Sequence, residues 1–441
     1  MNIFFRTPVI VCIAVLPALL CASGSHAGEL PGAIPGNEEE IYGTDAETGL
    51  MSGEDPGGIG AENGRTAVRT GKPGVRLAWD ALFRLNFDNM EYDPSPIASS
   101  GTIFGARLTP AIGIDGFARN GSKHRLMLGI DIMKDFGRSP IPEYMAGGAT
   151  SETDATQNNL RLFGELVFYY RFSAIFGKTD LSLTAGIFPK SLSGAEDYPR
   201  SFFSDRSRFY DNNYEGLLIS FTRPRAYYEA GCDWIGMYGT DRRERFMIFS
   251  RGRAEVLPWM SLGYYAYMYH FAGCDNVWGV VDNILLNPYA EFSAAWKLPL
   301  QMFRMRLGLL ASGQNDRRMS GKYTFPMGGE WTFEIRKWNA GLRHDMFVGK
   351  NMMPYYTNAD GGGFLYADRL YFGDPFYRMG SDFGVYNRIE VYWEPHLADF
   401  VDLRIGLSGH FHEKYSGFQQ QVGLVFGVER MRKSLSGKKR K

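Results

Sequence analysis

Apolar and polar residues alternate one by one along most of the chain after residue 73. In the stretch GVRLAWDALFRLNFDN, residues 74–89, every second side chain from Val75 to Phe87 is apolar, and Arg76 and Arg84 lie between them. A period of two is typical of a β-strand that has one apolar and one polar face. The pattern therefore predicts a strand in this stretch.

The same alternation recurs as far as residue 431. It is clearest in five further segments, residues 123–136, 159–172, 301–312, 385–394 and 400–411. We interpret the pattern as about sixteen strands of roughly 10 to 14 residues, a length that suits tilted strands crossing a bilayer. Strands of soluble sandwiches are shorter, about five or six residues. The sequence predicts an all-β protein, a closed antiparallel transmembrane β-barrel of about 16 strands, which leaves no exposed strand edge.

The connections between the predicted strands fall into two alternating sets. The first set is short, at residues 118–122, 173–179, 223–225, 257–259, 298–300, 339–341 and 395–400. The second set contains the long ones, at residues 138–158, 191–213, 273–284, 315–328 and 350–380. Short turns on one side and long loops on the other are typical of an outer-membrane barrel, with the turns in the periplasm and the loops outside the cell.

Three segments flank the predicted barrel, which occupies residues 74–431. Residues 1–27 have the basic, apolar and small-residue order of a cleaved signal peptide, although Cys21 leaves a lipoprotein as an alternative. Residues 28–73 are rich in Gly, Pro and acidic residues, and we interpret them as a flexible periplasmic leader. Residues 432–441 form a basic C-terminal tail. We expect the mature chain in the outer membrane of a Gram-negative bacterium.

Charge and cysteine content narrow the possible functions. Lys plus Arg and Asp plus Glu both total 48, and this balance argues against nucleic acid as a partner. Only Cys232 and Cys274 remain after signal removal, with no disulfide framework and no zinc spacing, so we expect neither a metal nor a cofactor. Ser408 and His410 share a strand face, but a lone pair of this kind is weak support for catalysis. The expectation is that the chain is not an enzyme.

The polar faces of the strands would line the lumen of such a barrel. The charged residues that would form this wall are of both signs: Arg84, Arg125, Arg161, Glu165, Arg251, Arg253, Glu291, Arg304, Arg306, Glu334, Arg388, Glu390 and Arg404. These residues either brace and solvate the wall or act together as a charge filter. Over all inward positions of the predicted strands the two signs nearly balance, because further acids such as Asp131, Glu229 and Glu330 share this face. Small hydrophilic solutes that are neutral or of mixed charge therefore fit better than phosphate or cations.

The loop at residues 191–213 mixes charges with aromatic rings. About sixteen strands, short inner turns and a long loop after the fifth strand resemble the general bacterial porins, in which this loop folds into the barrel and narrows it. The resemblance implies a constriction whose charges are Glu196, Asp197, Arg200, Asp205, Arg206, Arg208 and Asp211. The alternative is an extracellular loop that packs only on its neighbours.

A second resemblance is confined to residues 187–238. FFSDRSRFYDNNYEGLLISF and YYEAGCDWIGMY are similar to segments of Bacteroidetes-type outer-membrane barrel proteins, most of which have no assigned function. These resemblances imply outer-membrane lipid, lipopolysaccharide and the outer-membrane assembly machinery as partners, and a homotrimer as one oligomeric state. The chain departs from the porin pattern at its end, where the basic tail replaces the aromatic residue that the assembly machinery reads.

From these features we predict a porin-like channel for passive diffusion of small hydrophilic solutes. Two alternatives remain open. One is a structural or secretion-associated barrel that docks partner proteins. The other is a transporter of hydrophobic substrates with residues 28–73 as its plug, which the scarcity of apolar residues in that segment disfavours.

Overall fold

The structure is a computed structural model that describes residues 73–95, 97–136, 160–194, 197–294, 298–319, 321–363, 365–378 and 382–431, without the side chains of residues 160–164 and 368. The predicted signal peptide, all but the last residue of the predicted leader, the predicted tail and the whole loop at 138–158 lie outside the described residues. So do Glu196 and the side chain of Arg161.

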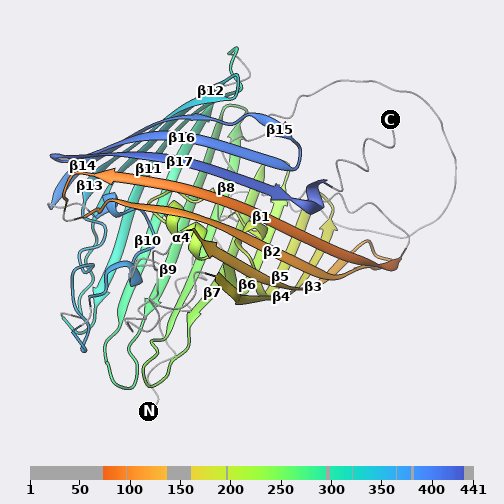
Figure 1. Cartoon of the computed structure of the whole chain (residues 1–441), viewed down its shortest axis with the longest axis horizontal. Helices are drawn as coiled ribbons and strands as arrows, with labels where there is room; N and C mark the ends of the chain where they lie inside the picture. The colour runs from red at the N-terminus through yellow and green to blue at the C-terminus, as the bar shows by residue number, and fades with distance from the viewer. Residues whose placement is uncertain are drawn as a thin grey trace, which may run out of the picture. The chain divides into compact units, whose positions relative to one another are not determined.

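The described chain is almost entirely β-structure (Figure 1). Its strands are β1 Gly74–Tyr92, β2 Gly101–Phe117, β3 Lys123–Asp135, β4 Leu160–Phe176, β5 Thr179–Pro189, β6 Asn213–Arg223, β7 Ala226–Gly236, β8 Arg245–Leu257, β9 Met260–Phe271, β10 Val281–Ser293, β11 Met302–Asp316, β12 Met327–Lys337, β13 Ala340–Lys350, β14 Phe383–Trp393, β15 His396–Ala398, β16 Val401–His412 and β17 Tyr415–Gly427. Its helices are α4 Asp205–Tyr210 and the 3₁₀ turns η2 Lys190–Leu192, η5 Ala367–Arg369 and η6 Pro375–Tyr377, and residues 428–431 are also helical.

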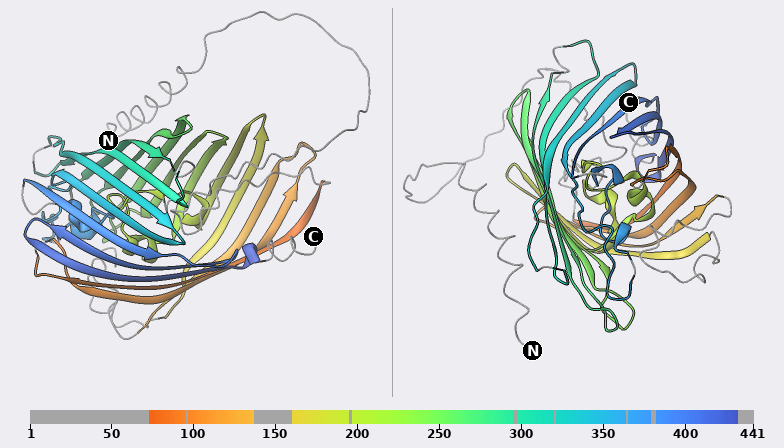
Figure 2. Two further views of the ribbon diagram at one scale, coloured as in Figure 1. Left: turned by 90° about the horizontal axis from the view of Figure 1, so that it is seen from above. Right: turned by 90° about the vertical axis from the view of Figure 1, so that its left-hand side faces the viewer.

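The strands form one closed antiparallel barrel (Figure 2). Each long strand pairs with the next along the chain, and β17 pairs back with β1, for example at Arg84 and Val425. The sheet has 17 strands, but β15 is only three residues long. It lies in the connection between β14 and β16 and pairs with β16. The predicted fold, a closed antiparallel barrel of about 16 long strands, is therefore confirmed.

Short and long connections alternate around the barrel, so its two ends differ. The turn end carries two-residue turns such as 177–178 and 338–339, and Trp338 and Asn339 have φ values of 52° and 62°. Two consecutive positive φ angles are the geometry of a type I′ hairpin turn, whose twist matches that of the flanking strands. The loop end carries the long loops, including L3 (residues 190–212) and L7 (residues 351–382).

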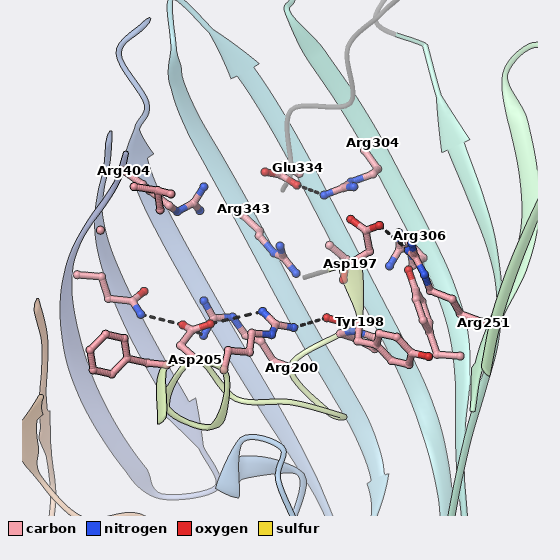
Figure 3. A pocket seen from close by; sticks show the side chains of 18 of the residues that line it. Asp197, Tyr198, Arg200, Asp205, Arg251, Arg304, Arg306, Glu334, Arg343 and Arg404 are labelled. Atoms are coloured by element: carbon pink, nitrogen blue, oxygen red, sulfur yellow. Dashed lines mark hydrogen bonds and ion pairs between the residues drawn. The ribbon is translucent and has the colours of Figure 1, made fainter. Parts of the chain in front are cut away.

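Apolar side chains face outward from the wall. On β11, Leu307 and Leu309 are 42% and 47% exposed, whereas the alternate residues Arg304 and Arg306 point into the lumen (Figure 3). A belt of exposed apolar side chains around a closed sheet is the outer surface that a lipid bilayer covers in outer-membrane barrels. The chain is a barrel of the outer-membrane type.

None of the helices in the described ranges is long and apolar enough to cross a membrane.

The largest buried apolar cluster lies inside the barrel. L3 contributes Phe202 and Phe203, L7 contributes Tyr371 and Phe376, and the wall contributes further rings such as Tyr267. All are less than a tenth exposed. Rings from the two loops and from the wall thus pack together inside the lumen. Figure 2 shows ribbon segments inside the barrel.

Candidate functional site

L3 crosses the inside of the barrel and is fixed to several strands. The rings of Tyr198 and Tyr265 on β9 lie 5.1 Å apart, and those of Phe202 and Tyr267 lie 5.3 Å apart. Ser201 Oγ donates a hydrogen bond of 3.1 Å to Glu330 Oε1 on β12. L3 is therefore in the lumen, because the side chains it contacts are on the inner face of the wall.

L3 contains the short helix α4, Asp205–Tyr210. Ser204 caps it: its Oγ accepts a hydrogen bond from the amide of Ser207 at 3.2 Å, which satisfies one of the open donors of the first turn. Phe209 on α4 is buried, with the Arg107 guanidinium 5.9 Å from its ring centre. The mixture of charge and aromatic rings has a simple cause, since the rings anchor L3 to the wall, while the charges form ion pairs such as Arg200 with Asp205 and Asp197 with Arg251 of the wall.

L7 lies against L3. The amide of Ser204 donates to the carbonyl of Phe372 at 2.8 Å, and the hydroxyl of Tyr371 donates to the carbonyl of Ser201 at 2.7 Å. The amide of Asp374 donates to the carbonyl of Arg200, also at 2.8 Å. The two loops therefore form one packed body across the lumen.

Arg200 joins the charges of the two loops. Its Nη1 lies 2.5 Å from Asp205 Oδ2 in L3 and 3.7 Å from Asp374 Oδ2 in L7. Burial alone raises the pKa of Asp205, but the charges of Arg200 and Arg208 outweigh it and hold the pKa well below its usual value. Burial raises the pKa of Asp374 to about 6, although the charge of Arg200 acts in the opposite direction. The two carboxyls around one guanidinium thus titrate in different pH ranges.

A cavity of about 290 Å³ lies between L3 and the wall (Figure 3). Nine arginines line it: Arg84, Arg200, Arg208, Arg251, Arg253, Arg304, Arg306, Arg343 and Arg404. The acidic side chains that line it are Asp197, Asp205 and Glu334. The chain as a whole has no net charge, but the surface of this cavity is mainly cationic.

Most of the carboxylates that pair with these arginines are buried and lie further from the cavity than the guanidinium groups do. Glu291 is 3% exposed and lies 2.6 Å from Arg306 and 2.9 Å from Arg253. Glu390 is 1% exposed and lies 2.8 Å from Arg388 and 2.9 Å from Arg404. This layering places carboxylates against the sheet and guanidinium groups toward the cavity.

Strand register explains why these side chains meet. Residues Arg304 and Glu334 are direct partners across β11 and β12, and their side chains are 2.5 Å apart. Glu291 is the partner of Arg306 across β10 and β11. Oppositely charged residues that face each other across neighbouring strands stabilise a sheet.

The structure brings most of the predicted constriction charges to one place, but not all. Asp197, Arg200, Asp205 and Arg208 line the cavity, and Asp197 pairs with Arg251 of the wall. Asp211 instead pairs with Lys190 at 2.6 Å.

The remaining predicted residues lie elsewhere in the barrel. Arg206 lies against Gly101 of β2. Arg125 pairs with Asp115 at 2.7 Å near the turn end. Glu165 accepts a hydrogen bond from Asn213, and Arg388 is fully buried among its partners.

Uncharged members of the cavity were not singled out from the sequence. The tyrosines Tyr227, Tyr265 and Tyr289 line it, together with Arg343, which the alternation also places on the inward face. The Arg306 guanidinium lies 4.4 Å from the ring centre of Tyr289, and that of Arg251 lies 4.5 Å from Tyr227. Extending the inward register of each strand to uncharged residues would have identified these tyrosines.

Groups suited to ester chemistry occur outside the cavity. At the turn end, Ser122 Oγ lies 3.1 Å from His124 Nε2, and His124 Nδ1 lies 2.7 Å from the hydroxyl of Tyr170. At the loop end, His270 Nδ1 lies 3.9 Å from Asp282 Oδ1 on the outward face of β9 and β10.

The predicted pair Ser408 and His410 is engaged differently. Ser408 Oγ accepts a hydrogen bond from Arg388, and the ring nitrogens of His410 contact Tyr386 and Gln419.

A closed barrel with an apolar outer belt and two loops packed inside a charged lumen defines an integral outer-membrane β-barrel protein. The chain belongs to the lipid A 3'-O-deacylase-type family, whose model matches residues 78–381. The expectation that the chain is not an enzyme is therefore wrong, because this family is named for an enzymatic activity. A search among curated proteins gave no match.

Several solved structures have a similar chain path. OccK1 (OpdK) of Pseudomonas aeruginosa is 9% identical with a TM-score of 0.42, over 80% of this chain and 98% of its own. An anion-selective porin from Comamonas acidovorans is 10% identical with a TM-score of 0.44, over 80% and 100% of the two chains. An OmpT loop-deletion mutant of Vibrio cholerae is 10% identical with a TM-score of 0.43, over 80% and 99%. Similarity this distant carries no argument about function.

Proposed function

We propose that the barrel is an outer-membrane channel through which small hydrophilic solutes diffuse passively, filtered by the charged groups of its lumen and by L3. The observation that carries this proposal is the cavity itself, which lies inside the closed sheet and is lined by charged groups of L3 and of the wall. Ionised side chains keep their hydration there, as in a water-filled lumen.

L3 and L7 set the conditions for passage. Because their rings pack together in the lumen, we expect the open path to be narrow and to depend on how firmly L7 stays in place. The channel then conducts in small steps, with an open fraction that rises when the contacts between L3 and L7 are weakened. This behaviour distinguishes the protein from a wide, permanently open pore.

Purified full-length protein in planar bilayers tests the proposal. We expect stepwise ion conductance, and Arg208→Glu should shift the reversal potential toward cations because Arg208 lines the cavity. Arg223→Gln is the matched control, since Arg223 is exposed near the turn end, where it donates to Thr179. Bilayers that stay silent at high protein density would contradict the channel, and a stable co-purifying protein would then favour the docking alternative.

A second candidate is hydrolysis of an acyl ester of a lipid in the outer leaflet, and family membership favours it. His270 and Asp282 face outward at the loop end, which is the level of that leaflet if the long loops are extracellular. Arg317 Nε donates to Asp282 at 2.8 Å and Tyr323 donates to it at 3.1 Å. In this role His270 takes a proton from water, the water oxygen attacks the ester carbonyl, and the leaving alcohol receives the proton.

Mass spectrometry of lipid extracts tests this second candidate. Cells or vesicles that contain the protein should lose one acyl chain from lipid A, and His270→Gln should abolish the loss. His344→Gln is the control, because His344 lies on the wall elsewhere and contacts Asn387 at 3.2 Å. Deacylation that persists in His270→Gln would remove this site from consideration.

A further inference from the structure

We propose that the luminal cavity binds small anions that carry at least two negative charges, such as a tricarboxylate or pyrophosphate. The inference deepens the proposed channel function, on which it rests for the route of the solute, by naming the class of solute that the channel prefers. It differs from the expectation drawn from the near balance of inward-facing charges, which favoured neutral or mixed-charge solutes.

The first argument is the imbalance of charge on the cavity surface. Nine guanidinium groups line the cavity with three carboxylates, whereas the remaining carboxylates of the network sit behind the arginines. A solute in the cavity therefore meets mainly cationic groups at close range, and most of the anionic groups of the network lie beyond them. Because the interaction falls with distance and the wall has a low dielectric constant, the nearer layer decides the sign of the preference.

The second argument is that several carboxylates are shared between two arginines. Glu291 serves both Arg253 and Arg306. Asp345 lies 2.9 Å from Arg343 and 3.5 Å from Arg388. One negative charge cannot neutralise two positive ones, so the group of Glu291, Arg253 and Arg306 retains a positive excess. Arg388 has a second carboxylate in Glu390, but Glu390 is itself shared with Arg404. A guanidinium also has five N–H donors, more than one carboxylate accepts.

The third argument is that the arginines are held in place before any solute arrives. Arg306 lies over the ring of Tyr289, and Arg251 lies over that of Tyr227. Among the described residues that line the cavity there is no lysine. Stacked guanidinium planes are suited to paired hydrogen bonds with carboxylate and phosphate oxygens, and their fixed orientation reduces the entropy lost on binding.

The size of the cavity limits the solute. Its volume of about 290 Å³ is at the lower end of the range of roughly 300–1,000 Å³ for small-molecule sites. A tricarboxylate or a pyrophosphate fits such a space, and a polymeric anion does not. The side chain of Arg253 is 42% exposed, which leaves a guanidinium accessible to an entering anion.

Calorimetry on the full-length protein in neutral detergent tests the inference. Citrate and pyrophosphate are titrated separately at low ionic strength, with maltose as the uncharged comparison. The test variant is Arg253→Gln combined with Arg343→Gln, because Glu291 keeps Arg306 and Asp345 keeps Arg388 when these two charges are removed. Arg223→Gln removes one cation outside the cavity and serves as the control.

We expect both anions to bind, maltose not to bind, and the double variant to bind the anions at least ten-fold more weakly than Arg223→Gln. Raising the salt concentration should weaken binding in the wild type more than in the double variant. Equal affinity in the double variant and the control, or no binding by the wild type, would overturn the anion site.

Because calorimetry in detergent needs no transport, the two proposals fail separately. Anion binding without conductance in bilayers rejects the channel and keeps the site. Conductance without anion preference keeps the channel and rejects the site.

Discussion

The backbone amide of Asp374 in L7 donates a hydrogen bond to the carbonyl oxygen of Arg200 in L3, with 2.8 Å between nitrogen and oxygen. The side chains of the same two residues are 3.7 Å apart. One residue pair therefore links the loops through both backbone and charge, and the strength of the link depends on the protonation of Asp374.

The docking of L7 should weaken as pH rises. Burial raises the pKa of Asp374 from 3.8 to about 6, so the docked loop binds a proton more tightly than the free loop does. This proton therefore stabilises the docked state of L7. The stabilisation is fully present below about pH 4 and is lost as the pH rises through about 6, and it amounts to roughly 3 kcal/mol at most. Hydrogen exchange of L7 amides at pH 4.5 and pH 7 measures the change.

Asp374→Asn is the matched variant for this titration. Asparagine imitates the protonated carboxyl, so exchange in L7 should change much less between the two pH values, after correction for the intrinsic pH dependence of exchange. A dependence equal to that of the wild type would mean that another group controls the loop. Asp205 acts in the opposite direction. Its pKa is lowered, so the stability that it contributes is lost only when the pH falls below the usual pKa of an aspartate.

Truncating Phe376 should loosen the packed loops. This ring is 1% exposed and lies 4.6 Å from the ring of Tyr386 and 5.1 Å from that of Tyr92. Phe376→Ala leaves a cavity in this cluster at a cost of about 3–5 kcal/mol of local stability. We expect the channel to open more often in single-channel recordings. Unchanged open probability would show that L7 does not control passage.

A side chain at Gly194 should displace L3. A Cβ at this position would lie 1.4 Å from Arg251 Nη2, where no atom can be accommodated. Gly194→Ala should therefore break the contact of L3 with Arg251 and increase protease cleavage in residues 190–212. Gly329→Ala is the control, because nothing lies within 4 Å of its Cβ position. Equal cleavage in both variants would contradict the close approach.

A charge on the outer face should destabilise the barrel in lipid. Leu309 is 47% exposed in the middle of β11. Leu309→Arg should lower the free energy of unfolding in lipid vesicles by about 2–4 kcal/mol, the cost of arginine near the bilayer midplane. Leu309→Val should change it by much less. Urea unfolding followed by tryptophan fluorescence measures both, and equal stability would argue that this face does not contact lipid.

The strands could be predicted because a residue's face depends only on its position in a period-two pattern. The wall residues Arg304 and Glu334 follow from that pattern. L7 was predicted as a long connection at residues 350–380, but its packing inside the lumen could not be predicted, since its rings have no regular spacing and Tyr371 contacts Ser201, 170 residues away along the chain. Such contacts depend on how a loop folds back, and local sequence does not encode that.

The alternation pattern in the sequence also could not predict the cationic surface of the cavity. Counting inward charges gives a near balance of signs, because Glu291 and Glu390 count as much as Arg253 or Arg404. The structure shows that both glutamates are almost fully buried, at 3% and 1% exposure, while the arginines reach past them. Side-chain length explains the difference, since arginine extends further from the wall than glutamate does.

The pairing of β1 with β17 has a consequence for biogenesis. The strand that begins at Gly74 finds its last neighbour only in residues 417–427, so the first and final parts of the described barrel complete one hydrogen-bonded seam. A chain that stops before Tyr415 would leave two open strand edges, on β1 and β16, in contact with acyl chains. Insertion of the finished cylinder therefore has to wait until nearly the whole polypeptide has been delivered.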